Sequence, residues 1–265
     1  MSGPVDPAGG DRLERELGDG VLTLRIANEE RANALTERVL DAIVRAIDES
    51  RPPEVRVVLL GGAGERHFSS GADLAVRGID EWLERVKRTE AALSRAAGAV
   101  ANCHCPVIAV LNGDAIGGAL ELAMACDWRV AREGARFAMP PARLGLVYTA
   151  EGMRRFVAAI GQAHARELFL TGRAVDAARA ERIGLVGHVV PAEELWPLVG
   201  RMAAAVAANA PIAVEGMRAV LRAIADDENA DARAQQWRVK AFGSADLVEG
   251  LAATRERRPP EFTGA

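Results

Sequence analysis

The sequence predicts an α/β protein in which a mixed core is followed by a helical C-terminal region. Three observations support this prediction: strand-like and helix-like segments alternate up to about residue 150, the pattern is mainly helical afterwards, and only helical segments follow Pro191. Alternation of this kind is typical of α/β cores, and a later run of helices predicts an appended helical layer. A chain of 265 residues, 49% of them hydrophobic, is long enough to bury a substantial core.

The first third of the chain alternates between the two periodicities. Residues 21–26 alternate as a half-buried strand does, and residues 54–60 form a β-branched apolar run that a Gly-Gly pair ends. Between them, Thr36 is placed to cap a helix whose apolar residues recur every three to four positions. Residues 79–100 have the pattern of a longer amphipathic helix.

The middle of the chain repeats the strand-then-helix order. Residues 106–111 predict a buried strand closed by the turn pair Asn112-Gly113, and residues 117–125 predict a short, almost wholly apolar helix. Residues 127–130 form a further candidate strand.

The last part is expected to be helical, with Gly161 and Gly172 as interruptions and one more strand at 186–190. Four helices are predicted beyond it, at about 192–208, 211–225, 229–241 and 244–256. No repeat of fixed period is visible in the sequence.

Composition narrows the classes of function. A formal net charge of −4 with no long basic run gives no support for nucleic-acid binding. No apolar run approaches the ~20 residues that a membrane span needs. Residues 1–11 are rich in Gly and Pro and lack a basic n-region and an apolar h-region, so they predict a disordered lead-in and not a signal peptide. We expect a cytoplasmic protein.

The three cysteines are Cys103, Cys105 and Cys126, an odd number that argues against a disulfide framework. The tripeptide Cys103-His104-Cys105 resembles part of a metal site. However, no second ligand pair stands at zinc-finger spacing, and the tripeptide leads directly into an apolar strand. The sequence therefore favours structural thiols and no metal.

Two glycine-containing segments, 68–74 and 111–122, each follow a predicted buried strand. Gly118 stands where the first turn of a helix begins, so its N–H is free and lies at the positive end of the helix dipole. Two such N–H groups aimed at one point would stabilise a developing oxyanion. The pattern alone does not distinguish an oxyanion site from a simpler alternative. In that alternative, the glycines only allow tight turns and close packing.

A dinucleotide site is the alternative for Gly61-Gly62-Ala63-Gly64. That fingerprint needs a further glycine three residues after the second, and His67 stands there. The helix that should open at this point is also replaced by a continuing loop. We therefore reject this interpretation.

Several ordered motifs resemble the crotonase (enoyl-CoA hydratase/isomerase) superfamily. Residues 55–74 resemble its first signature, and residues 106–127, with Asn-Gly…Gly-Gly-Ala-Leu-Glu-Leu-Ala…Cys-Asp, resemble its second. Residues 31–35 are similar to an early segment that contacts coenzyme A, and residues 170–185 and 257–264 also match. The resemblance covers nearly the whole chain after residue 12, and it is specific for the superfamily but weak for the reaction.

The resemblance implies a spiral of ββα turns over residues 12–195 and a helical trimerisation region over residues 196–265, in a homotrimer or a dimer of trimers. It also implies an acyl-CoA substrate and no separate cofactor. Family members hold the thioester carbonyl between two backbone N–H groups, which fall on Ala72 and Gly118. The residues that the resemblance places along coenzyme A are Arg31, Asn33, Ala34, Ser70, Gly71, Asp73, Leu74 and Gly117.

The resemblance is less clear about the reaction. Hydratases of the family use two glutamates; the first corresponds to Glu121, but the second position is occupied by Pro141, which has no proton to give or take. A carboxyl among apolar neighbours is partly desolvated, and this raises its pKa toward a catalytic range. Because the match to the family is exact at Glu121, the resemblance implies an active-site role for it. The simpler alternative is an acid that favours the helix N-terminus.

Tyr148 is the only tyrosine, and its segment resembles that of methylmalonyl-CoA decarboxylase, a superfamily member that also lacks the second glutamate. That enzyme has a histidine where this chain has Ala72. A phenol could orient or hydrogen-bond a substrate carboxylate, whereas the alternative for Tyr148 is a half-buried loop aromatic. Asp114 is read as a turn residue and Glu151 as a helix-start acid, although either could enter the site.

Two functions remain open. The first is a lyase that hydrates a short enoyl-CoA with a single glutamate or decarboxylates a malonyl-type CoA. The second is a non-catalytic acyl-CoA binder that retained the pair of N–H groups. The candidates for the acyl pocket are Val76, Ile79 and Trp82.

Overall fold

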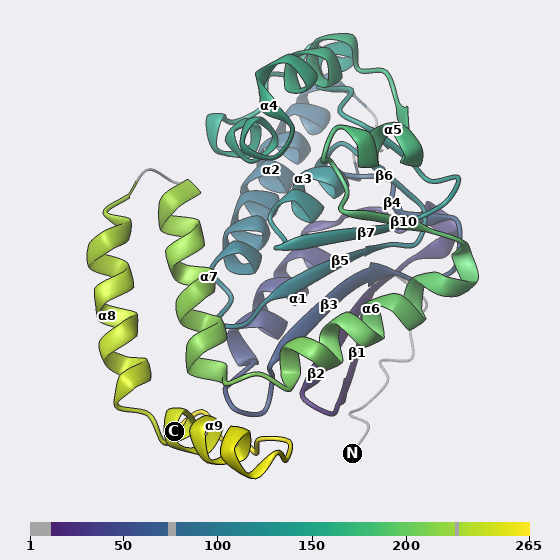
Figure 1. Ribbon diagram of the computed structural model, residues 1–265. Coiled ribbons are helices and arrows are strands. Elements are labelled where there is room, and N and C mark those ends of the chain that lie inside the picture. The colour runs from purple at the N-terminus through teal and green to yellow at the C-terminus, as the bar shows by residue number, and fades with distance from the viewer. Residues whose placement is uncertain (1–11, 74–77, 226–227) are drawn as a thin grey trace.

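The computed structural model describes residues 12–73, 78–225 and 228–265 (Figure 1). Residues 1–11, predicted to be a disordered lead-in, and the candidate residues Leu74 and Val76 lie outside the described part. The fold is α/β, as the sequence predicted, and helices dominate the C-terminal half. The strands form two sheets.

The larger sheet has six strands in the order β1-β2-β3-β5-β7-β10. Only the β1–β2 pair is antiparallel; every other neighbouring pair is parallel. The strands are β1 (Arg12–Gly18), β2 (Val21–Ala27), β3 (Val57–Gly62), β5 (Val107–Leu111), β7 (Trp128–Arg132) and β10 (His188–Val190).

The smaller sheet has four short strands in the order β4-β6-β8-β9. Its strands are β4 (His67–Ser69), β6 (Asp114–Ile116), β8 (Arg136–Ala138) and β9 (Val175–Asp176). The pairs β3/β4, β5/β6 and β7/β8 each give one strand to each sheet, and a helix follows each pair. This arrangement confirms the predicted spiral of ββα turns.

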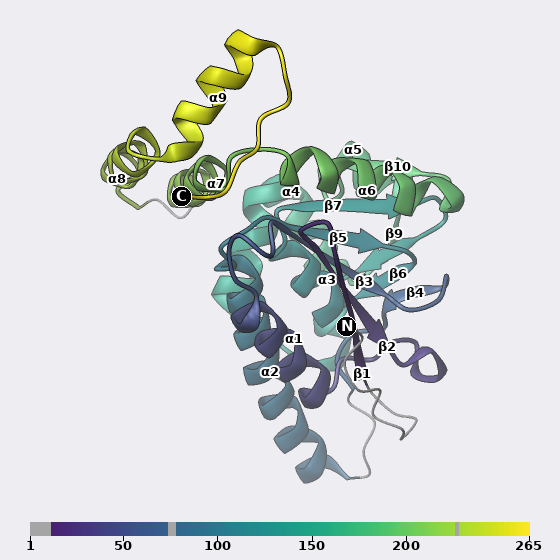
Figure 2. The same ribbon diagram turned by 90° about the horizontal axis from the view of Figure 1, so that it is seen from below.

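The two faces of the large sheet pack against different helices. In β3, Val58 and Leu60 belong to one apolar cluster, whereas Val57 and Leu59 belong to the other, because successive side chains of a strand point to opposite faces. The first cluster includes side chains of α1 (Glu37–Glu49), α2 (Ile79–Ala101) and α3 (Gly118–Met124). These three helices lie beside the large sheet in Figures 1 and 2. Strands buried on both faces explain the continuous apolar runs in the sequence.

The predicted caps and breaks of the helices are confirmed. The Thr36 hydroxyl accepts a hydrogen bond from the Val39 N–H at the start of α1, as an N-cap does. Gly161 interrupts α4 (Ala150–Thr171) with φ 71°, and Gly172 ends it with φ 59°. Both values lie in the left-handed region that glycine adopts without strain. The remaining short helices are η1 (Glu29–Arg31), η2 (Pro141–Leu144) and α5 (Ala177–Arg182).

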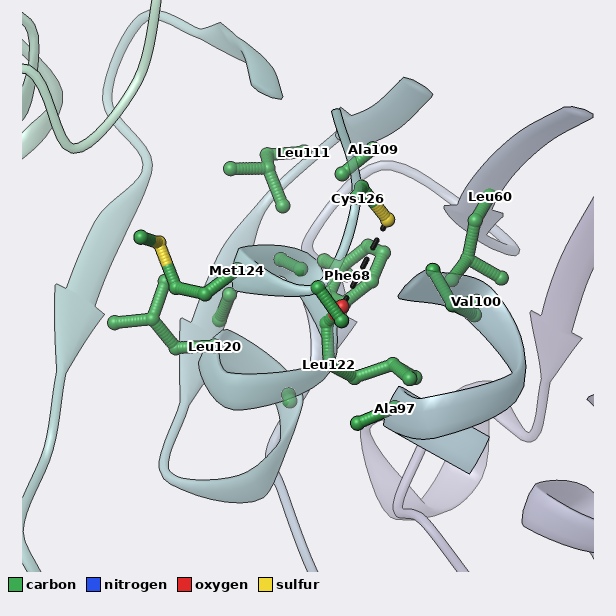
Figure 3. Close-up of a cluster of buried hydrophobic side chains, with 14 of the residues drawn as sticks. Leu60, Phe68, Ala97, Val100, Ala109, Leu111, Leu120, Leu122, Met124 and Cys126 are labelled. Atoms are coloured by element: carbon green, nitrogen blue, oxygen red, sulfur yellow. Dashed lines mark hydrogen bonds between the residues drawn. The ribbon is translucent and has the colours of Figure 1, made fainter. Parts of the chain in front are cut away.

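Helix α3 is buried along its whole length, which explains its almost wholly apolar sequence. Around its axis lie Phe68 from β4 and Ala97 and Val100 from α2, and Leu111 closes the cluster from β5 (Figure 3). A helix that is apolar on all sides needs such a complete shell. The residues at the N-terminus of α3 are therefore held by core packing.

The C-terminal helices divide into two groups. Helix α6 (Ala192–Ala207) packs on the second face of the sheet through Leu195, Val199 and Ala203, so the boundary expected between residues 195 and 196 falls inside a core helix. Helices α7 (Pro211–Ala225), α8 (Ala230–Phe242) and α9 (Ala245–Glu256) extend away from the sheet (Figure 2).

No single helix in the described ranges is long and apolar enough to cross a membrane. Helices α6 and α7 pass that test only as a pair, and they are bent by 107° relative to each other.

Candidate active site

Ala72 lies in a short extended segment that pairs with Leu35 as an isolated parallel bridge. The Leu35 N–H donates to the Gly71 carbonyl at 2.8 Å, and the Asp73 N–H donates to the Leu35 carbonyl at 3.0 Å. Successive N–H groups of an extended segment point to opposite sides, so the N–H of Ala72 points away from Leu35. The bridge thus fixes the direction of one of the two predicted N–H donors.

Gly118 is the first residue of α3, and its N–H belongs to the first turn, where no carbonyl of the same helix accepts it. A Cβ placed on Gly118 would lie 3.8 Å from the Ala72 nitrogen, and one placed on Gly71 would lie 3.5 Å from the Gly118 nitrogen. The two predicted donors are therefore neighbours.

The backbone between the donors requires glycine at two positions. Gly71 has φ 93°, and a Cβ there would lie 2.4 Å from the Ile116 carbonyl oxygen. Gly117, the N-cap of α3, has φ 57° and ψ −122°. A side chain would therefore clash at Gly71, and both positions have the positive φ that glycine adopts without strain.

Glu121 lies in the first turn of α3, and it is 6% exposed. Burial raises the pKa of its carboxyl to about 7; Arg155 opposes this shift, while Glu90 and Glu151 add to it. A Cβ on Gly152 of α4 would lie 2.7 Å from Oε1, so the carboxyl occupies the space that this glycine leaves. In the described part of the chain, no hydrogen bond to the Glu121 carboxyl is found, which leaves its oxygens for a ligand or water.

The Tyr148 hydroxyl lies near Gly117, the N-cap of α3. It is 3.8 Å from the position that a Cβ on Gly117 would take, and its ring packs edge-on against Phe169 at 5.8 Å between centroids. Burial raises the pKa of the phenol, and the charges of Glu121 and Glu90 raise it further. Tyr148 therefore remains a hydrogen-bond donor at neutral pH.

The other two acids considered in the sequence, Glu151 and Asp114, each form an ion pair with an arginine. The Glu151 carboxylate pairs with Arg155 at 2.6 Å, and it is 57% exposed. Asp114 accepts from the backbone N–H of Arg136 and pairs with its guanidinium at 2.9 Å, which ties β6 to β8. Pro141 is buried at the start of η2. Each of the two carboxylates is thus paired with an arginine.

Glu90 of α2 is an acid that the sequence did not single out. It acts on the pKa of both Glu121 and Tyr148. Leu93, one turn later on the same helix, lies 2.9 Å from the position of a Cβ on Gly118. Residues three apart on a helix lie on the same face, so Glu90 shares a face of α2 with Leu93. The contact between Leu93 and α3 is therefore the signal that would have pointed to Glu90.

The segments predicted to contact coenzyme A lie together. The Ser70 N–H donates to the Ala32 carbonyl at 2.9 Å, and Arg31 pairs with the buried carboxylate of Asp73 at 2.6 Å. Arg85 approaches the same carboxylate at 3.5 Å. Asn33 is used internally, since its amide nitrogen donates to the carbonyls of residues 63 and 67 at 2.9 and 2.8 Å.

Ala34 follows the same turn and is buried. Of the candidates for the acyl pocket, Ile79 is 67% exposed at the start of α2 and Trp82 is half-buried.

The family model described as enoyl-CoA hydratase/isomerase matches residues 16–265. YngF of Bacillus subtilis, which carries that family name, is 36% identical over 236 residues, covering 88% of this chain and 90% of that protein. Crotonyl-CoA hydratase of Syntrophomonas wolfei is 32% identical over 264 residues, covering 94% of this chain and 96% of that protein. The crystal structure of an enoyl-CoA hydratase from Bacillus anthracis superposes with a TM-score of 0.89 at 32% identity, covering 96% of this chain and 99% of that one.

The spiral of ββα turns and these matches define a crotonase-fold enzyme. The chain belongs to the enoyl-CoA hydratase/isomerase family, which confirms the resemblance found in the sequence.

Proposed function

We propose that the chain is an acyl-CoA lyase that binds a thioester carbonyl between the N–H groups of Ala72 and Gly118 and stabilises the resulting enolate. The observation that carries the proposal is the buried Glu121 carboxyl, with its pKa raised to about 7, on the same helical turn as Gly118. At neutral pH such a carboxyl exists in both its protonated and its ionised form. A group that takes a proton and later returns it needs both forms.

Hydration of a short enoyl-CoA fits one carboxyl. The oxygen of a water attacks Cβ, the π electrons move into the thioester enolate, and the proton of the water passes to the Glu121 carboxylate. The same carboxylic acid then returns the proton to Cα as the enolate collapses. The two N–H groups stabilise the enolate oxygen between these steps, and an oxyanion donor of this kind contributes about 3–4 kcal/mol. No second acid is needed, so Pro141 is compatible with this route.

The test is the pH dependence of crotonyl-CoA hydration, followed by the loss of enoyl-thioester absorbance. Because the ionised carboxylate must accept the proton, kcat/KM should rise as the pH passes through about 7 and then level off. Glu121→Gln should lower kcat by about 10²–10⁴-fold, and the exposed Glu151→Gln should not. A flat profile together with an active Glu121→Gln enzyme would reject the route.

Decarboxylation of a malonyl-type CoA is a second candidate, and the Tyr148 phenol favours it. A donor that stays protonated beside Gly117 could orient a substrate carboxylate. The Cα–carboxylate bond breaks, its electron pair enters the enolate, CO₂ leaves, and Cα then takes a proton from water. Methylmalonyl-CoA assayed beside crotonyl-CoA distinguishes the two reactions. Unchanged decarboxylation by Tyr148→Phe would remove the phenol from this mechanism.

We further propose that seven of the residues named by the resemblance contact coenzyme A: Arg31, Asn33, Ala34, Ser70, Gly71, Asp73 and Gly117. The ion pair between Arg31 and Asp73 supports this because it holds a guanidinium beside the extended segment of Ala72. Retained binding of coenzyme A without turnover of either acyl-CoA would leave only the non-catalytic binder.

The predicted self-association is supported by the helices that project from the core. Met217, Leu221 and Ile224 of α7 are each more than 60% exposed and stand at i, i+4 and i+7, so they form an apolar stripe. Exposed apolar residues continue on α8 and α9 at Val239, Phe242, Val248 and Leu251. We propose that these faces bind further copies of the chain. A monomer at micromolar concentration in light scattering would contradict this.

A further inference from the structure

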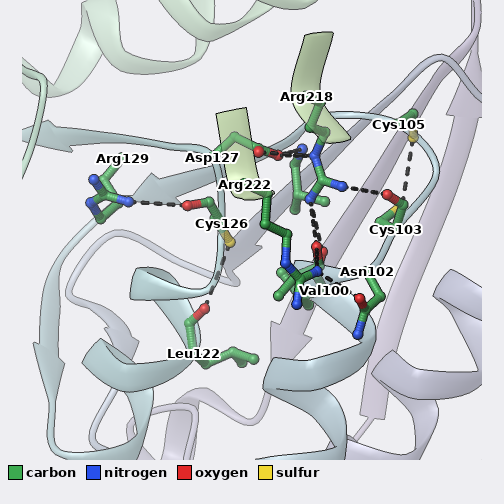
Figure 4. A network of polar contacts seen from close by, with 12 residues as sticks. Val100, Asn102, Cys103, Cys105, Leu122, Cys126, Asp127, Arg129, Arg218 and Arg222 are labelled. Carbon is green, nitrogen blue, oxygen red and sulfur yellow. Dashed lines mark hydrogen bonds and ion pairs between the residues drawn. The ribbon is translucent and has the colours of Figure 1, made fainter. Parts of the chain in front are cut away.

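The tripeptide Cys103–Cys105 lies at the corner between α2 and β5, away from the pair of N–H groups described above. Both thiols are buried, and their Sγ atoms are 3.6 Å apart (Figure 4). A ring nitrogen of His104 and the two sulfurs all lie within 4.8 Å of one another. Three potential metal ligands are therefore gathered at one point of the fold.

His104 is oriented by a residue from a distant part of the chain. Its Nε2 lies 2.9 Å from the carbonyl oxygen of Val55, to which it donates, and this leaves Nδ1 with the lone pair. Histidines that bind metals are usually fixed in this way, with the second nitrogen bonded to a carbonyl or carboxylate. The contact is supplied by the fold, since 49 residues separate the partners.

The spacing of the sulfurs suits a tetrahedral thiophilic ion. A zinc–sulfur bond is about 2.3 Å long, so a zinc ion bound to two sulfurs 3.6 Å apart would have an S–Zn–S angle of about 103°. Two thiolates balance the charge of Zn²⁺, and their protons go to solvent when the ion binds. Neutral imidazole would be the third ligand.

The surroundings allow an ion to approach. A cavity of about 300 Å³ is lined by Cys103, His104 and Glu215, and a smaller one is lined by His104, Cys105 and Glu215. The carboxylate of Glu215 therefore borders both cavities, and it or a water could fill a fourth position. The nearby cation, Arg218, is compensated because its Nε lies 2.9 Å from both carboxylate oxygens of Asp127.

We propose that Cys103, His104 and Cys105 form a binding site for a thiophilic cation with a filled d shell, and zinc is the first candidate. The sequence favoured structural thiols because no second ligand pair stands at zinc-finger spacing. The structure adds two features that spacing could not show, namely the carbonyl of Val55 behind His104 and the cavities bordered by Glu215.

The position gives the site a structural consequence. Arg218 of α7 donates to the Cys103 carbonyl, and Arg222 of α7 donates to the Asn102 side-chain oxygen at 2.6 Å (Figure 4). A metal ion would stiffen the corner on which the projecting helices dock. Zinc should therefore raise the thermal midpoint of unfolding of the full-length chain.

Cobalt(II) tests the site without reference to enzyme activity. The reduced, metal-free protein, with three free thiols confirmed by thiol titration, is titrated with cobalt chloride. We expect a thiolate-to-cobalt charge-transfer band and strong visible bands of a tetrahedral ion, saturating at a single cobalt per chain. Zinc should displace the cobalt, since zinc binds such sites more tightly.

Variants assign the ligands. Cys103→Ser and Cys105→Ser should each weaken the charge-transfer band, the double variant should lose it, and His104→Gln should lower the cobalt affinity by at least about tenfold. The matched control is Cys126→Ala, which leaves only the two proposed thiols and should bind as the unmodified protein does. Absence of the band in the reduced protein, or its persistence in the double variant, would overturn the proposal. If the cysteine variants fail to fold, as circular dichroism would show, an unchanged affinity of His104→Gln overturns it instead.

Discussion

Replacing Glu121 by Gln should make the protein more stable while it removes the reaction. The carboxyl has an ordinary pKa of 4.5, and burial in the folded chain raises it to about 7. At roughly 1.4 kcal/mol for each pKa unit, folding works against the ionisation of this group by about 3 kcal/mol. Glutamine has nearly the same shape and carries no charge, so the substitution removes this cost.

The sign of the pH dependence follows from the raised pKa. Below pH 4.5 the carboxyl is protonated in both the folded and the unfolded chain, and it has no effect on the pH dependence. As the pH rises through 4.5 the unfolded chain ionises first, so the free energy of unfolding falls until the pH passes about 7. The stability of Glu121→Gln relative to the unmodified protein should therefore be about 3 kcal/mol greater at pH 8 than at pH 4.

Urea unfolding at pH 4, 6 and 8 measures this difference, provided that the m-value is unchanged. Glu65→Gln is the matched control, since it neutralises an exposed carboxylate and should shift stability by less than about 0.5 kcal/mol. If Glu121→Gln changed stability equally at all three pH values, the raised pKa would be refuted. If it were less stable at pH 8, a buried carboxylate with a specific partner would have to be inferred.

Three further substitutions test packing and ion pairing, two of them near Glu121 and Gly118 and one at the Asp127–Arg218 pair. Gly118→Ala would place a methyl group 3.8 Å from the Ala72 nitrogen, and kcat should fall by at least about 10²-fold with little change in the circular dichroism spectrum. Gly152→Ala would place a methyl group 2.7 Å from Oε1 of Glu121, and thermal unfolding should show a loss of about 1–3 kcal/mol. Arg218→Met should cost about 3 kcal/mol in chemical unfolding, because it removes the cation that pairs with the Asp127 carboxylate and leaves that carboxylate with the Val107 N–H; an unchanged midpoint would contradict that role.

Much of the fold could be predicted because its signals are local. The positions of α1, α2, α3 and the four last helices follow from apolar periodicity and from caps such as Thr36 and Gly172. The buried strands β3 and β5 follow from their continuous apolar runs. The start of β3 at residue 57 instead of 54 reflects the turn over residues 52–54, which holds Val55 N–H against the Arg51 carbonyl at 2.9 Å.

The elements that were missed depend on pairing. Strand β1 has no buried residue, and it is defined by its antiparallel partner β2. Strands β4, β6 and β8 have only three residues each, too few to show a period. In such segments the hydrogen bonds of the partner strand decide the structure.

For the site, the sequence by itself determined which groups exist: glycines at 71, 117 and 118, an acid at 121, and a proline where hydratases of the family have a second acid. These are properties of single positions and of short spacings. Only the tertiary structure decided how these groups are arranged. It brought the Ala72 and Gly118 nitrogens together, and it set Glu121 against Gly152 in surroundings that raise its pKa to about 7. It also placed Val55 behind His104. The physical reason is that desolvation and hydrogen-bond geometry depend on neighbours in space, and those neighbours come from strands and helices far apart in the chain.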